Sequence, residues 1–197
     1  MRYDAEHKER TPQRILAEVA SAIRPEGPDR VGVAEIMAEL GLTHGGFYAH
    51  FASKDELVAC ASTYMFDQAI ARFERRTAGL APAEGLRAYI DWYSSTAHRD
   101  APGCGCALAA LSGDLPRLPA DARARFTEGA ARLPAAIARL LGDLGRADAE
   151  ALAVSTIAEL VGALALSRAI ADGERSEKIL RVSREAIKAR LGLGAGA

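Results

Sequence analysis

The stretch Val33–Val58, VAEIMAELGLTHGGFYAHFASKDELV, decides how this chain folds. Its first half spaces apolar side chains at i, i+3, i+4 and i+7, at Val33, Ile36, Met37 and Leu40. That spacing gives one apolar face of an amphipathic helix. Gly41 follows, and there a left-handed turn costs little because glycine has no Cβ. The stretch therefore begins with a short packed helix that ends at a glycine turn.

A second short helix follows the turn. The Thr43 hydroxyl is placed to accept a hydrogen bond from the first free N–H groups, so we predict that it caps this helix. Phe47 and Phe51 lie four residues apart and bury one side, while His44 and Tyr48 face elsewhere. One helix that packs and a second that presents its N-terminal residues form the helix-turn-helix layout. We expect the second helix to enter the major groove of DNA.

The run LTHGGFYAHFASKDELV resembles the DNA-binding signature of the tetracycline-repressor (TetR) family of transcription regulators. The resemblance extends from about Gln13 to Val58 and includes Gly41, Gly45, Tyr48, His50, Phe51, Ser53, Lys54 and Leu57 at the family's spacing. Many members carry a threonine where Gly46 stands. The resemblance implies a helix-turn-helix DNA-binding domain over residues 1–56 and a ligand-binding and dimerisation domain over residues 57–197. It also implies repression that a ligand relieves.

Apolar periodicity predicts an all-α fold of about nine helices. Ser53 and Glu56 form a capping box that opens a long fourth helix linking the two domains. Pro134 predicts a kink or a split in a helix that runs from about residue 119 to 141. Ser176 is expected to cap the last helix.

Composition supports this reading. The 197 residues are 49% hydrophobic but only 6% aromatic, which favours a helical bundle over a β-sandwich. The charged N-terminus does not resemble a secretory signal. The longest apolar stretch, residues 151–171, is interrupted by Ser155, Glu159 and Arg168, which argues against a membrane span. Three cysteines, an odd number, suggest no disulfide framework, so we expect a reducing cytoplasm.

Net charge does not by itself favour a nucleic-acid partner. Residues 1–56 carry seven basic and ten acidic side chains, a net charge of −3. The segment Thr43–Ser53, however, contains two histidines and no acid, and Lys54 follows it directly. Two such patches in a dimer would lie on one face, so we expect DNA binding with few phosphate contacts and strong salt sensitivity.

The residues expected to contact double-stranded DNA are Thr43, His44, Gly45, Tyr48, His50 and Lys54. The glycine removes bulk at the helix front, and His44 projects from the first turn as the expected base reader. Tyr48 and Lys54 are expected to bind phosphate, the latter as a point charge. His50 has an alternative role, packing against the first helix with an internal hydrogen bond.

A small-molecule effector is expected between the fifth and eighth helices, with Phe66 of the fourth closing the cavity toward the DNA-binding domain. The candidate lining residues are Phe66, Tyr89, Trp92, Tyr93, His98, Cys106, Leu111, Phe126, Ile137 and Ile157. Plain core packing is the alternative for each. Aromatic residues are scarce, so the grouping of Tyr89, Trp92 and Tyr93 favours a largely apolar ligand with one or two polar groups.

The last two helices have apolar and small-residue faces, which suit a four-helix homodimer interface; ordinary intrachain packing is the alternative. Cys104 and Cys106 raise a second hypothesis, a regulator that senses oxidants or thiophilic metals. A helical enzyme is the contrasting class. The chain lacks the phosphate-loop, dinucleotide, H-E-x-x-H and G-x-S-x-G motifs, so we predict no catalytic residue, no resident metal and no cofactor.

Overall fold

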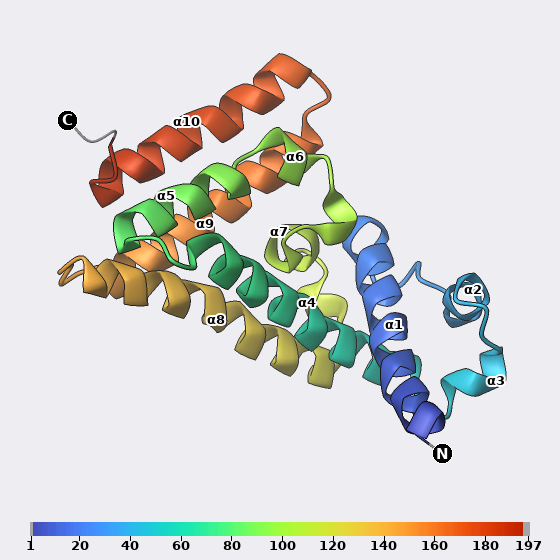
Figure 1. The fold of residues 1–197 in the computed structure, drawn as a ribbon. Helices are drawn as coiled ribbons and strands as arrows, with labels where there is room; N and C mark the ends of the chain where they lie inside the picture. Colours follow the sequence, from blue (N-terminus) through green and yellow to red (C-terminus); the bar gives the residue numbers. More distant parts are fainter. Residues whose placement is uncertain (1, 195–197) are drawn as a thin grey trace.

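The computed structural model describes residues 2–194, with side chains described for residues 11–194, and within that range every regular element is helical (Figure 1). The α-helices of this range are α1 (Arg2–Glu26), α2 (Val33–Glu39), α3 (His44–Phe47), α4 (Lys54–Thr77), α5 (Pro82–Tyr93), α6 (Thr96–Arg99), α7 (Ala107–Leu111), α8 (Ala120–Asp143), α9 (Ala149–Ala169) and α10 (Gly173–Leu191). Two 3₁₀ turns, η1 (Pro102–Cys104) and η2 (Leu115–Arg117), flank α7. The predicted all-α class is confirmed, with α6 as an unforeseen short helix.

Helices α1 to α3 form a small unit at one side of the molecule (Figure 1). The apolar face of α1 places Ile15, Val19 and Ile23 in the core, each at most 1% exposed. Phe47 and Phe51 are buried against the same cluster and stack with ring centroids 5.7 Å apart. The buried aromatic and aliphatic residues predicted from the sequence therefore hold α1, α2 and α3 around one hydrophobic cluster, in which α3 packs against α2.

Helix α4 starts from the predicted capping box and joins the small unit to the larger bundle. The Ser53 hydroxyl accepts from the Glu56 N–H at 3.1 Å, and the Glu56 carboxylate accepts from the Ala52 N–H at 2.6 Å. The same hydrophobic core holds Phe51 of the small unit and Phe66 of α4. The proposed domain boundary at residues 56/57 thus falls within the first turn of α4, a helix that both parts share.

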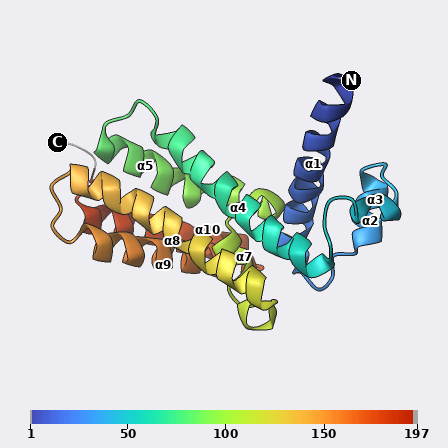
Figure 2. The same ribbon diagram turned by 90° about the horizontal axis from the view of Figure 1, so that it is seen from below.

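Helix α8 runs along α4 over most of its length (Figure 2). The two helices approach tightly at Gly129, where a Cβ would lie 2.2 Å from the Phe66 ring. Phe66 itself packs edge-to-face on Phe126 with centroids 4.9 Å apart. The helix continues unbroken through Pro134, so the split considered from the sequence does not occur. Close helix packing, not a ligand cavity, occupies this part of the α4–α8 interface.

Helix α9 is apolar on nearly all sides. The helix has 21 residues, and an 18-residue window within it has a mean hydropathy of 1.7, which meets the length and composition expected of a membrane span; 39% of that window is buried. Ser155, Glu159 and Arg168 were expected to argue against a membrane span, but by length and composition they do not exclude one. A core helix of a soluble protein has the same composition, and α9 here packs against α8 and α10.

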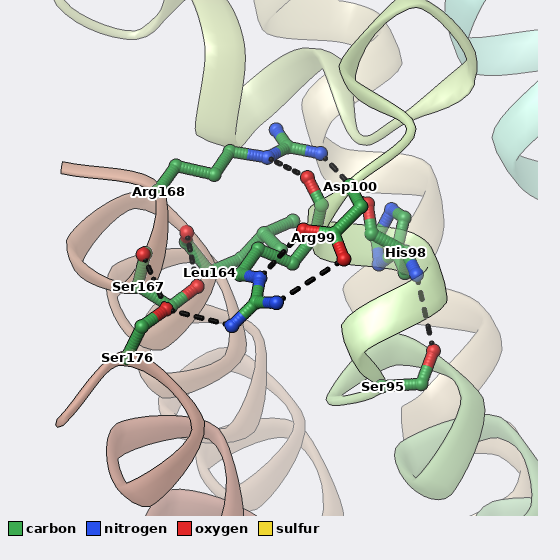
Figure 3. Close-up of polar contacts among 8 residues, drawn as sticks. All are labelled: Ser95, His98, Arg99, Asp100, Leu164, Ser167, Arg168 and Ser176. Carbon is green, nitrogen blue, oxygen red and sulfur yellow. Dashed lines mark hydrogen bonds and ion pairs between the residues drawn. The ribbon is translucent and has the colours of Figure 1, made fainter. Parts of the chain in front are cut away.

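The predicted cap of α10 is wrong. The helix begins three residues before Ser176, at Gly173, and the Asp172 side chain accepts from the Arg175 N–H at 2.8 Å. Ser176 is instead buried, and its hydroxyl donates to the Ser167 carbonyl at 2.6 Å and accepts from Arg99 at 2.9 Å (Figure 3). A hydroxyl inside the first turn of a helix is free for such tertiary bonds once another residue caps that helix.

Candidate functional site

The front of α3 is built by a local cap. The Thr43 hydroxyl accepts from the Gly46 N–H at 3.2 Å, as predicted. The α-helical part is only four residues long and gives way to a tight turn in which the His50 N–H donates to the Phe47 carbonyl at 2.9 Å. Two adjacent glycines favour this shortness because glycine loses more backbone conformational entropy than other residues when it enters a helix.

Three of the predicted DNA-contacting residues, His44, Gly45 and Tyr48, are exposed at the surface of α3. Tyr48 is 62% exposed, and its ring packs edge-on against His44 at 5.7 Å and Phe47 at 5.1 Å between centroids. Gly45 is exposed as well, and a Cβ there would meet no atom within 4 Å. The surface of α3 is therefore open to a partner, with an aromatic hydroxyl and an imidazole side by side.

The remaining two candidates lie at the edges of this surface. Lys54, at the start of α4, donates to the Asp29 carbonyl at 3.2 Å, which holds its ammonium beside the turn between α1 and α2. His50 is half-buried. We call residues 43–54, which hold all six predicted contacts, the reading segment.

The ten predicted ligand-lining residues divide into two groups. Five of them line one small pocket: Tyr89, Trp92, Tyr93, His98 and Cys106. The other five lie elsewhere in the packed cores: Phe66, Leu111, Phe126, Ile137 and Ile157. The pocket has a volume of about 10 Å³, room for roughly one water-sized group. The aromatic grouping predicted from the sequence thus forms, but around a nearly closed pocket.

Burial sets the protonation of the polar groups in this pocket. It lowers the pKa of His98 from 6.5 to about 4, although the hydrogen bond to the Tyr93 carbonyl opposes the shift. The guanidinium groups of Arg168, Arg72 and Arg76 lower the pKa of His98 further. Burial and the nearby Cys106 thiol raise the pKa of the Tyr93 hydroxyl well above 10. Both side chains are therefore neutral at physiological pH.

Three arginines, none singled out from the sequence, hold the chain between α6 and α7 by its carbonyl groups. Arg24 of α1 donates to the Gly103 carbonyl at 2.7 Å, and Arg72 of α4 donates to the Cys104 carbonyl at 2.7 Å. Arg168 of α9 donates to the carbonyls of residues 98 and 99 at 2.9 and 3.0 Å (Figure 3). We call residues 96–106 the clamped segment, because three separate helices hold it.

Arg24 is the most buried of these cations. It is 6% exposed, and its other hydrogen bonds go to the Ala20 carbonyl at 3.1 Å and the Gln68 side chain at 2.8 Å. Burial, with repulsion from Arg72, lowers its pKa from 12.5 to about 10. In the sequence Arg24 reads as a solvated basic residue of a last helical turn. Its hydrogen bond to Gly103 could not be inferred from the sequence, because the two residues lie 79 positions apart in the chain.

The described cysteines are free thiols, with Cys104 exposed and Cys106 buried in the pocket wall. Among the side chains of residues 11–194, no group of three His, Cys, Asp or Glu residues is placed to hold a metal ion. The pocket combines aromatic walls, a thiol and two neutral polar groups. That lining can bind a small ligand by contact and hydrogen bonding.

Comparison with known proteins agrees with the geometry of the reading segment. Residues 15–60 match the family model described as bacterial regulatory proteins, tetR family. The match begins at Ile15, within α1, and continues through α2 and α3 into the first turns of α4. No curated protein sequence matches the chain.

Solved structures share the fold over almost the whole chain. A TetR transcriptional regulator from Chloroflexus aurantiacus J-10-FL is 24% identical, with a TM-score of 0.79 over 98% of this chain and 97% of that one. A TetR transcriptional regulator from Legionella pneumophila is 20% identical, with a TM-score of 0.79 over 91% and 96% of the two chains. The reduced form of E. coli NemR is 19% identical, with the same TM-score and the same coverage. At these identities the likeness shows a common fold.

Proposed function

Because this chain carries the DNA-binding domain of the tetR family of bacterial regulatory proteins, we propose that it is a ligand-responsive repressor. It binds a palindromic operator as a homodimer and leaves it when a small, largely apolar molecule binds. The observation that carries this proposal is the front of α3, which Thr43 caps and which is exposed to solvent. All the predicted contact residues lie at or near it, within the reading segment. The division at residues 56/57 into DNA-binding and ligand-binding parts belongs to the same proposal.

The reading segment suits a groove that is lined by phosphates. Backbone N–H groups at the start of α3 and the Thr43 hydroxyl favour a phosphate, and the exposed Tyr48 hydroxyl is a second donor. Gly45 leaves space for the backbone to approach the DNA. His44 reads a base edge from the first turn, and Lys54 adds a point charge, with His50 at the edge of the contact.

DNA binding is tested by a mobility shift with the chain's own upstream DNA at low salt. Replacing Tyr48 by alanine should weaken binding about tenfold, because one buried phosphate contact is worth roughly 1–1.5 kcal/mol. Since the side chain is 62% exposed, the fold and the dimer should persist in sedimentation. Replacing Leu80, which is 44% exposed in the turn between α4 and α5, by alanine is the matched control. If the unmodified protein does not shift this DNA at low salt, the proposal that the chain is a DNA-binding regulator is wrong.

The proposed dimer uses the exposed apolar faces of α9 and α10. Leu166 and Val182 are 58% and 52% exposed, and a groove of about 400 Å³ runs along α10 beside Val182. Apolar faces of this kind are typically covered by a second copy. Leu166→Glu should yield monomers in sedimentation, whereas Leu80→Glu, at a side chain 44% exposed in the α4–α5 turn, should not. If both the Leu166→Glu and the Leu80→Glu variants remain dimeric, the dimer uses another interface.

The effector is proposed to act through the clamped segment. Arg72 links the wall of the pocket to the Cys104 carbonyl, and Arg24 of α1 bonds to the neighbouring Gly103 carbonyl. A ligand that binds the pocket better in one conformation shifts the population toward that conformation. The coupling needed is about 1–3 kcal/mol, within reach of a few such hydrogen bonds. The two reading segments of the dimer then no longer match the half-site spacing.

A second candidate keeps DNA binding but assigns sensing to the cysteines. Cys106 lines the pocket and Cys104 is exposed two residues before it. One of the similar structures is described as a reduced form. Peroxide and zinc are titrated at stoichiometric dose while DNA release is followed. Release that Cys106→Ser abolishes would favour this candidate, and indifference to both reagents would remove it.

The proposal places the protein in the cytoplasm, where its DNA is found, and assigns it no catalytic role. The pocket holds His98 and Cys106, residue types that enzymes also use. His98, however, stays neutral and its Nδ1 bonds to a backbone carbonyl at 2.8 Å rather than to a carboxylate. A helical enzyme remains the contrasting class, and the mobility shift separates the two readings.

A further inference from the structure

The pocket beneath Trp92 contains two buried polar atoms that lack a hydrogen-bond partner. These atoms are the Nε2 of His98 and the hydroxyl oxygen of Tyr93, on side chains 4% and 1% exposed. Both side chains line the same cavity of about 10 Å³. The Cys106 thiol beside the Tyr93 hydroxyl is only a weak acceptor. Unpaired buried polar groups are costly, so two of them in one cavity point to a hydrogen-bonding group that binds there.

The hydrogen-bonding roles of the two atoms follow from their surroundings. The Nδ1 of His98 lies 2.8 Å from the Tyr93 carbonyl, which can only accept, so Nδ1 carries the ring hydrogen. The neutral ring then offers Nε2 as an acceptor. Tyr93 keeps its proton because burial raises its pKa, so its O–H is a donor. The cavity therefore presents one acceptor and one donor to whatever enters it.

A hydroxyl group satisfies both atoms at once. It donates to Nε2 and accepts from the Tyr93 O–H, whereas a carboxylate can only accept and leaves Nε2 unpaired. An ammonium group only donates, and the arginines at positions 72, 76 and 168 oppose a further positive charge beside His98. A cavity of about 10 Å³ also admits one group of the size of water. Charge, hydrogen bonding and volume thus select the same group.

We propose that this cavity is the subsite where the effector's hydroxyl group binds, between His98 and Tyr93, with an aromatic body seated against Trp92. This inference rests on the proposed function, which gives the chain an effector. The rings of Tyr89 and Trp92 and the Leu133 side chain form the apolar walls nearest the subsite. A small neutral phenol has the matching chemistry.

The way into the subsite passes Arg72. The inner wall of the cavity is buried, whereas Ala69, Arg72 and Trp92 are half-buried and form its mouth. The Arg72 guanidinium lies 5.1 Å from the centre of the indole ring and donates to the Cys104 carbonyl. The Arg76 guanidinium lies closer, 4.5 Å from the same ring centre, so an aromatic ring seated on the indole displaces both guanidinium groups and breaks the Arg72 bond to the clamped segment. Recognition of the hydroxyl and release of the clamp then occur in one binding event.

The test compares phenol with toluene, which has a similar shape but no hydroxyl group. Each is titrated into the full chain without DNA, following the fluorescence of Trp92, the single tryptophan of the chain. Phenol should bind at least about tenfold more tightly, because toluene leaves both buried atoms unpaired. Equal affinities, or no response to phenol, would overturn the subsite. So would tighter binding of benzoate or benzylamine than of phenol.

Variants locate the effect. Tyr93→Phe removes the donor and keeps the ring, so the preference for phenol should fall several-fold while toluene binding stays unchanged, because only the bond to the His98 Nε2 remains. Tyr64→Phe, at a half-buried tyrosine of α4 outside the pocket lining, should keep the preference. If Tyr93→Phe does not fold by circular dichroism, His98→Asn replaces it, since asparagine preserves a donor near Nδ1 and removes Nε2. An undiminished preference for phenol over toluene in a folded Tyr93 or His98 variant contradicts the proposal.

A mobility shift on the same samples separates this inference from the proposed function. A chain that binds phenol through Tyr93 but no DNA would contradict the repressor and leave the hydroxyl subsite standing. A chain that shifts its DNA but shows no preference for phenol would contradict the subsite alone.

Discussion

The reading segment and the clamped segment have similar lengths, but they are held in opposite ways. In the reading segment the Thr43 and Ser53 hydroxyls accept from the N–H groups of Gly46 and Glu56, each only three residues further along the chain. In the clamped segment the arginine bonds to the carbonyls of residues 103 and 98 span 79 and 70 residues. Local sequence therefore builds the surface proposed to meet DNA, whereas distant helices hold the segment proposed to respond to the pocket.

Exposure follows the same division. The reading segment presents Tyr48 and His44 to solvent, and its caps are surface hydrogen bonds. The clamped segment buries His98, and the bonds that Arg24 and Arg168 make to its carbonyls are partly buried, whereas the Arg72 bond to the Cys104 carbonyl is exposed. A bond at the surface competes with water and contributes little net stability, while a buried one is costly to break. Perturbing the clamped segment should therefore affect the whole fold, and perturbing the reading segment should affect DNA binding first.

The largest expected effect is a loss of stability at low pH, caused by His98 of the clamped segment. The unfolded chain protonates His98 at its usual pKa of 6.5, but the folded chain resists until its lowered pKa of about 4. Because the unfolded state binds more protons in this window, the free energy of unfolding falls as the pH drops from 6.5 to 4. The loss should be about 3 kcal/mol in urea unfolding. His98→Asn should lack this component, and equal pH slopes of the two proteins would contradict the burial of a neutral imidazole.

A methyl group tests how closely the clamped segment approaches α1. A Cβ at Gly103 would lie 2.8 Å from the Ser21 hydroxyl and 3.2 Å from the Ser21 carbonyl, so Gly103→Ala must push η1 away from α1. We expect a loss of about 1–3 kcal/mol in the free energy of unfolding. Gly113→Ala is the control, since a Cβ there meets no atom within 4 Å. Similar stabilities for the two variants would show that the approach is not tight.

Removing the cap of α3 should have a smaller and more local effect. Thr43→Ala leaves the Gly46 N–H without its acceptor, which costs about 1 kcal/mol of helix stability. Amide exchange at residues 44–47 should accelerate and DNA affinity should fall, while exchange in α8 and α9 stays unchanged. Thr43→Ser retains the acceptor and serves as the control. A matching acceleration in α8 would mean that the reading segment is not held locally.

The smallest expected effect is a gain. Gly45→Ala adds a methyl group that meets no atom within 4 Å and lowers the backbone entropy of the unfolded chain. We expect the free energy of unfolding to rise by about 0.5–1 kcal/mol in thermal melts. Gly46→Ala should give less, because its Cβ would lie 3.4 Å from the Thr43 hydroxyl. A loss at Gly45 would show that α3 needs its backbone freedom.

The sequence was most informative where a signal and its partner lie within one helical turn. The caps at Thr43 and at Ser53–Glu56 are confirmed because each needs only a hydroxyl and an N–H three residues on. The cap at Ser176 is wrong because Asp172, four residues earlier, offers a competing acceptor. The tertiary structure then gives Ser176 a different use, between α9 and Arg99.

Prediction of the pocket succeeded only in part. The aromatic group Tyr89, Trp92 and Tyr93 lies on one helix, α5, so helical spacing brings its members together. Phe66 and Phe126 have the same apolar character, but they pack against each other across α4 and α8 and fill space that a ligand would need. Residue type marks a side chain as buried without saying which helix will face it.

The sequence by itself determined the all-α class, the helix-turn-helix and the residues of the reading segment, because these depend on helical periodicity and on contacts within a few residues. Only the tertiary structure decided that Arg24, Arg72 and Arg168 meet around the clamped segment and that His98 and Tyr93 share one small cavity. Those meetings depend on how long helices cross, and the side chains involved carry no local mark of their distant partners.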